Sequence, residues 1–109
     1  MPQVLTYEVE SIIDQSHFHK DVKFISATHT ITGGTVFVCD AAGGAFTITL
    51  PSVATYKNRI ITVKRVSASN TVTVDGAGAE TIDGAATYDL TSQYEQVTIF
   101  SDGDEWHII

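Results

Sequence analysis

A series of short β-branched runs, each stopped by turn residues, most limits what this chain can fold into. Thr, Val and Ile number 15, 11 and 11 among the 109 residues. Their branched side chains lose χ1 freedom in a helix and pack well on a pleated sheet. From residue 35 onward the runs recur at intervals of roughly 8 to 12 residues, which is typical of sandwiches and barrels. We therefore expect an all-β fold.

The runs of the second part of the chain predict eight strands. In residues 45–50, Phe46, Ile48 and Leu50 fall on one face, and Pro51 ends the run. Such alternation predicts a small antiparallel β-sandwich, a barrel-like sheet or a β-prism. The other expected strands are residues 35–39, 59–66, 71–74, 80–82, 87–90, 94–101 and 106–109.

Glycine-containing pairs mark the expected turns between these strands, because Gly adopts positive φ without a steric cost. Residues 74–76 and 82–84 share the pattern of an apolar residue, Asp and Gly at a spacing of eight. This recurrence fits two rungs of a small repeat or a hairpin pair, and we favour the hairpin pair. The turn residues are Gly43, Gly44, Asp75, Gly76, Asp83, Gly84, Asp102 and Gly103.

The first 34 residues differ from the rest. Residues 7–15 are compatible with a short helical turn or an extended arm, and residues 22–25 and 28–32 with short strands. We expect an N-terminal arm over residues 1–34 and a compact β domain over residues 35–109. The Met at position 1 leads us to expect a complete reading frame with one short extension.

Charge and hydropathy exclude several classes of protein. Six Lys and Arg stand against thirteen Asp and Glu, giving a formal charge of −7. Nucleic-acid binding needs a cluster of basic residues, so we exclude a nucleic-acid partner. No run of eighteen apolar residues is present, which excludes a membrane-spanning helix. The first ten residues carry two glutamates and no basic segment, unlike a secretory signal.

Two histidines in the expected arm are the candidate metal ligands. His17 and His19 share one side of an extended strand, because residues i and i+2 point the same way. Two imidazoles are too few for a tight site, but three chains around an axis would supply six. We favour the alternative, a solvated pair, and expect no cofactor.

The residues that suggest an enzyme have simpler interpretations. A glycosidase uses a pair of carboxylates, and four carboxylic residues near the C-terminus are of this type: Glu95, Asp102, Asp104 and Glu105. An expected turn beside Gly103 makes solvated charges the better interpretation. The single cysteine excludes an internal disulfide and a thiolate zinc site. We expect this residue, Cys39, to be an inert thiol at the end of an apolar strand. We expect no catalytic residues.

Several sequence blocks between residues 36 and 109 carry a family resemblance. They are DAAGGAFTITLP (40–51), ITVKR (61–65), NTVTVD (70–75), ETIDGA (80–85), QYE (93–95) and SDG (101–103), followed by Trp106. In order and spacing they resemble a β-rich module of tailed-bacteriophage virion proteins, found in tail-fibre, baseplate and head-decoration chains. The resemblance covers about two-thirds of the chain and implies structural residues only.

This resemblance implies an intertwined homotrimer, which would cover the exposed edges of a small β domain. We expect a capsid decoration protein of the cement or head-fibre type, assembled in the host cytoplasm and located on the virion. Its partners would be further copies of itself and the major capsid protein or tail proteins. The residues expected to anchor the arm to the shell are the apolar Val4, Leu5, Tyr7, Ile12 and Ile13.

The alternative function is a tail-fibre or baseplate module that binds host surface glycans. This alternative requires aromatic side chains exposed in a groove, with Tyr88 and Trp106 as the candidates. Packing of these aromatic residues in the core or between subunits is the simpler interpretation.

Overall fold

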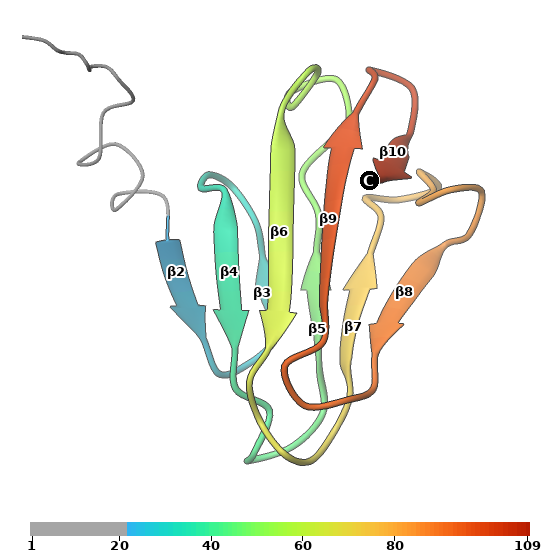
Figure 1. Cartoon of the computed structure of the whole chain (residues 1–109). Helices are drawn as coiled ribbons and strands as arrows, with labels where there is room; N and C mark the ends of the chain where they lie inside the picture. Colours follow the sequence, from blue (N-terminus) through green and yellow to red (C-terminus); the bar gives the residue numbers. More distant parts are fainter. Residues whose placement is uncertain (1–21) are drawn as a thin grey trace, which may run out of the picture.

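The computed structural model describes residues 22–109, which form strands joined by turns and loops (Figure 1). Within this range no helix is long and apolar enough to cross a membrane. The strands are β2 (Val22–Ile25), β3 (His29–Thr30), β4 (Val36–Cys39), β5 (Phe46–Thr49), β6 (Ile60–Arg65), β7 (Val72–Asp75), β8 (Thr87–Leu90), β9 (Gln96–Ser101) and β10 (Trp106–Ile108). The all-β prediction is confirmed.

The strands form two sheets, and the first six strands alternate between them. One sheet has five strands in the order β10-β9-β6-β4-β2, and the other has four in the order β3-β5-β7-β8. Strands β2, β4 and β6 run parallel in the first sheet, as do β3, β5 and β7 in the second. The chain therefore advances as a short coil, in which each strand lies beside the strand two elements earlier.

The last three strands close the coil with antiparallel pairs. β8 pairs with β7, β9 pairs with β6, and β10 pairs with β9. Both sheets are therefore mixed, and the expectation of antiparallel pairing is wrong for the pairs among β2–β7. A parallel pair needs a crossover connection, and here a strand of the facing sheet supplies each crossover. β2 and β3 pair with β4 and β5, so the sheets include residues that the sequence pattern assigns to the arm.

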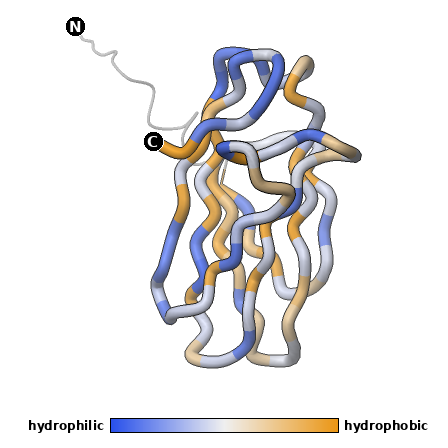
Figure 2. The backbone as a smooth tube through the Cα atoms, turned by 90° about the vertical axis from the view of Figure 1, so that its right-hand side faces the viewer, coloured by the Kyte–Doolittle hydropathy of each residue, from blue (hydrophilic) through white to orange (hydrophobic). Residues whose placement is uncertain are grey.

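The core lies between the two sheets and follows the alternation of each strand. Along β5 the pattern is buried Phe46 and Ile48 with half-buried Thr47 and Thr49. The same alternation is visible in the hydropathy of the backbone trace (Figure 2). The largest fully buried side chains include Trp106, Phe37, Ile31, Ile48, Leu50, Ile61, Ile82, Leu90 and Ile99. These side chains hold the two sheets together by removing apolar surface from water.

The segment between β7 and β8 ties the two sheets together at one end. Ile82 bridges Ala85 within a tight turn and also bridges Trp106 of β10. The backbone N–H of Trp106 donates to Thr81 O at 2.9 Å, and the backbone N–H of Asp83 donates to Trp106 O at 2.9 Å. β10 is an edge strand of the five-stranded sheet, so these bonds join it to a loop of the four-stranded sheet.

The Asp-Gly turns are formed in two different ways. Asp83 and Gly84 have φ of 49° and 84°, the left-handed pair that a two-residue hairpin turn requires. The φ of Gly76 is not positive, so the expectation that this turn uses glycine for its positive φ is wrong at Gly76. A Cβ at Gly76 would lie 2.2 Å from Glu80 O, and close backbone approach is what requires glycine there. β7 pairs with β8 across a long loop that holds the Asp83-Gly84 turn, so the hairpin partner of β7 is not the expected strand over residues 80–82.

Candidate functional site

The outer side of the five-stranded sheet is rich in apolar side chains. Register places Phe24, Val38 and Lys64 in one lateral row and Ile60 beside Phe100 in another, all facing away from the core. The side chain of Phe24 is 80% exposed and that of Ile60 is 46% exposed. We call this surface the apolar face; its apolar residues are Val22, Phe24, Val36, Val38, Ile60, Phe100 and Ile109.

The outer side of the four-stranded sheet has the opposite character. Register places Thr47, Thr73 and Asp89 in one lateral row, and Thr73 Oγ1 donates to Asp89 Oδ1 at 2.9 Å. The next row contains Thr49 and Asp75. Threonine and aspartate are suited to a solvated sheet face, so only the five-stranded sheet has apolar residues on both sides.

A groove of about 350 Å³ adjoins the apolar face at the end of β2. It is lined by Phe24, Ile25, Ser26, Val38, Asp40 and Val66. β2 is an edge strand, so its outer backbone groups face no other strand among the described residues. An exposed edge next to apolar surface is a template for contact with another chain.

A second cluster of functional interest lies at the opposite edge, around His107 of β10. His107 Nε2 lies 2.6 Å from Asp102 Oδ2, across the turn that joins β9 to β10. The N–H groups of Asp104 and Glu105 donate to Asp102 Oδ1 at 2.7 and 2.9 Å. These backbone hydrogen bonds, followed by the bond to His107, hold the pKa of Asp102 well below its usual value. The carboxylate is thus fixed as an acceptor.

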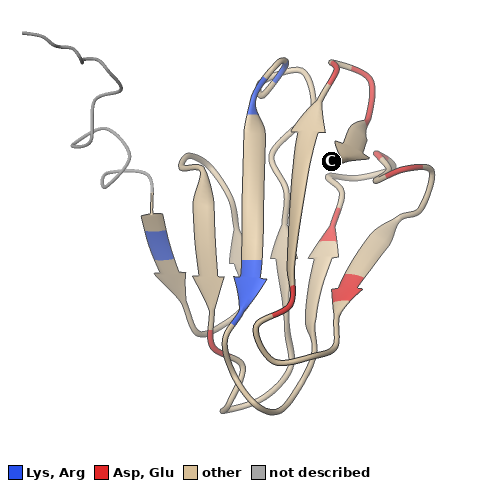
Figure 3. Cartoon of the chain, viewed as in Figure 1, with Lys and Arg blue, Asp and Glu red and all other residues tan. Residues whose placement is uncertain are grey.

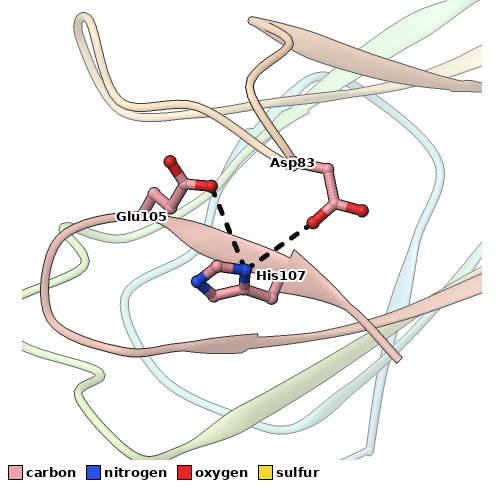
Figure 4. Close-up of side chains that lie close together, drawn as sticks. All are labelled: Asp83, Glu105 and His107. Carbon is pink, nitrogen blue, oxygen red and sulfur yellow. Dashed lines mark ion pairs between the residues drawn. The ribbon is translucent and has the colours of Figure 1, made fainter.

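The other ring nitrogen of His107 faces two further carboxylates (Figure 4). His107 Nδ1 lies 3.8 Å from Asp83 Oδ1 and 4.0 Å from Glu105 Oε2. The hydrogen bond to Asp102 is the main cause that raises the pKa of His107, and the nearby carboxylates add to it. Among the described residues, acidic side chains mark the loops around this cluster and also the end of β7, β8, the start of β9 and the loop after β4, whereas Lys and Arg lie on β2, β6 and the loop before β6 (Figure 3).

Comparison with models of known protein families finds none that matches this chain, and comparison with curated proteins finds no relative. The sequence resemblance and the two surfaces described above are therefore the features that bear on function.

The residues singled out from the sequence have different outcomes. The expected anchoring residues and metal ligands lie outside the described residues; they are Val4, Leu5, Tyr7, Ile12, Ile13, His17 and His19. Cys39 is buried at the end of β4 as expected, and desolvation raises the pKa of its thiol to about 12. Glu95 accepts hydrogen bonds from the N–H groups of Thr91 and Ser92, and so stabilises a loop away from Asp102.

The aromatic residues proposed for glycan binding do not form an exposed platform. Trp106 is 0% exposed and packs at 6.1 Å from the Tyr56 ring. Tyr88 is half-buried and packs against the core. Trp106 therefore does not supply the exposed aromatic side chain that the glycan-binding alternative requires, and the favoured interpretation, core packing, is confirmed for it.

The sequence pattern did not single out His107. Asp102, Glu105 and His107 lie within six residues around one turn, which is a detectable signal. Asp83 comes from another part of the chain, and only the bridge between Ile82 and Trp106 brings it to His107.

Proposed function

We propose that this chain is a structural protein of a bacteriophage virion that assembles as a homotrimer and decorates the outside of the capsid. The apolar face carries this proposal. It supplies a surface for self-association on one sheet, while the opposite sheet presents threonine and aspartate to solvent. The resemblance of residues 36–109 to virion modules independently supports a structural role.

The position of the apolar face fits association between copies. Phe24 lies on the edge strand β2, Ile60 lies on the central strand β6, and Phe100 lies on the next strand, β9. Apolar residues spread over the width of a sheet can pack against the same surface of a neighbouring copy. Three copies around one axis would cover this face and the open edge at β2 together.

The N-terminal arm would then bind the shell. Residues 1–21 directly precede β2, so in a trimer three arms would start near the same edge of each sheet. Their apolar residues, Val4, Leu5, Tyr7, Ile12 and Ile13, would bury surface against neighbouring capsid subunits. Each Å² of apolar surface buried contributes about 25 cal/mol, so three arms together would hold a shell more firmly than one.

Co-sedimentation with capsids that lack the protein tests this function. We expect saturable binding by the full chain, and loss of binding after deletion of residues 1–20, with the trimer retained because the deletion leaves strand β2 and the buried core intact. Retained binding by the deletion variant would overturn the arm assignment. A trimer that does not bind capsids but binds host cells would overturn the capsid-decoration function and favour the receptor-binding alternative.

A further inference from the structure

Three side chains at the β10 edge place metal-binding atoms around one point. One nitrogen of His107 and one oxygen each of Asp83 and Glu105 lie within 4.8 Å of one another. Metal–ligand bonds to such atoms are about 2.0–2.2 Å long, so neighbouring ligand atoms in a bound site lie roughly 3–3.5 Å apart. Small rotations of the two carboxylates, which are partly exposed, would close the difference.

The imidazole is already held with the correct nitrogen directed at this point. The Asp102 carboxylate accepts from Nε2 at 2.6 Å, so in the neutral ring Nδ1 carries the free lone pair. A carboxylate that accepts from the other ring nitrogen is the usual companion of a metal-bound histidine. The Phe100 ring stacks on His107 with the ring centroids 5.1 Å apart and the planes at 28°. The ring is therefore oriented by contacts outside the three candidate ligands.

The two carboxylates are also held in place by neighbours. Ile108 N–H donates to Asp83 Oδ1 at 3.2 Å, and Thr81 Oγ1 donates to Glu105 Oε1 at 3.4 Å. The second contact leaves Glu105 Oε2, the atom nearest His107, available. Asp83 stands in the left-handed turn, with φ of 49°.

We propose that Asp83, Glu105 and His107 bind one divalent transition-metal ion, for which Zn²⁺ is the best match. One imidazole nitrogen and two carboxylate oxygens form a ligand set that Zn²⁺ accepts, whereas Mg²⁺ and Ca²⁺ prefer oxygen alone. Water would complete the coordination, because all three side chains reach solvent. The three ligands come from a single chain, so a second copy is not needed to supply them.

The bound ion would join the two sheets. Asp83 belongs to the connection between β7 and β8, whereas Glu105 and His107 belong to the turn and strand that follow β9. A metal bound only by the folded chain raises its stability as the metal concentration rises. We therefore expect Zn²⁺ to raise the melting temperature, which would suit a protein on the outside of a particle.

The test is a Zn²⁺ titration of the full chain at pH 8, followed by NMR at the His107 ring nitrogens and by calorimetry. We expect a saturable change at Nδ1 of His107. Asp83→Asn and Glu105→Gln should abolish this change, and Asn is chosen because it tolerates the left-handed φ at position 83. Asp102→Asn should weaken binding about ten- to a hundredfold, because it loosens the ring without removing a ligand.

Asp104→Asn is the matched control, because it removes a charge from the same turn at a carboxylate that is not one of the ligands. We expect this variant to bind Zn²⁺ as the unmodified chain does. Zn²⁺ binding that leaves the His107 signals unchanged, for example at His17 and His19, would overturn the proposal. Equal weakening in Asp104→Asn and Asp83→Asn would also overturn it, since this would indicate general attraction by the acidic loops.

Discussion

Asp102 and His107 lie on opposite sides of the turn between β9 and β10, with Asp102 Oδ2 2.6 Å from His107 Nε2. Asp102 also accepts two backbone N–H groups through its other oxygen. The turn thus holds a carboxylate that positions the ring, and the ring directs its second nitrogen at two further carboxylates. This arrangement places one imidazole and three carboxylates together at the β10 edge.

The first prediction concerns the titration of this pair in metal-free buffer. The pKa of His107 is raised above the ordinary value of about 6.5, so its protonated form stabilises the fold below that pH. This contribution is lost as the pH rises through the raised pKa. Asp102 acts in the opposite sense, because its lowered pKa adds stability above about pH 4 that is lost on further acidification.

NMR titration of the His107 ring measures the first half of this prediction. Asp102→Asn should lower the pKa of His107, because it removes the largest cause of the shift. Asp104→Asn should change it much less, since Asp104 is not among the causes. An unchanged His107 pKa in Asp102→Asn would contradict the hydrogen bond between the two side chains.

The second prediction concerns Arg65, which points into the protein at the end of β6. Its side chain is 3% exposed, and its Nε has no hydrogen-bond partner. Burial without a partner costs free energy, so Arg65→Met should raise the free energy of unfolding by about 1 kcal/mol. Chemical denaturation measures this change. A clear loss of stability in Arg65→Met would contradict this prediction, because it would show that the guanidinium group stabilises the fold.

The third prediction concerns the close approach of backbone at Gly76. A Cβ there would lie 2.2 Å from Glu80 O, so Gly76→Ala should destabilise the fold by about 1–3 kcal/mol. Gly43→Ala is the control, because nothing lies within 4 Å of a Cβ at that position. Thermal unfolding should show little change for Gly43→Ala. Equal effects of the two substitutions would contradict the steric explanation.

The sequence predicts the strands far better than their pairing. Seven of the eight expected strands correspond to β4–β10, because alternation and β-branched side chains are local signals. The residues near Ile82 form only isolated bridges. Whether a turn returns within a sheet or crosses to the facing sheet is not encoded in strand alternation, so the parallel pairing of β2, β4 and β6 was missed. The contact of Asp83 with His107 depends on the same crossover and was missed with it.

The apolar face was equally hidden in the sequence. Ile60 and Ile61 are adjacent and chemically identical, yet Ile61 is fully buried while Ile60 faces outward. Only the register between β6 and β9 assigns the two residues to opposite sides. Predicting a surface that is formed by residues of several strands therefore requires the strand topology as well as the sequence pattern.

Light scattering on the full chain in solution measures self-association through the apolar face directly. We predict a mass of about 35 kDa, three times the chain mass of 11.8 kDa. Phe24→Glu should reduce this mass, because it places a charge on the exposed edge of the apolar face. Thr47→Glu, on the outer side of the other sheet, is the matched control and should leave the trimer intact. A monomeric mass for the unmodified chain, or a trimer unaffected by Phe24→Glu, would contradict trimer formation through the apolar face.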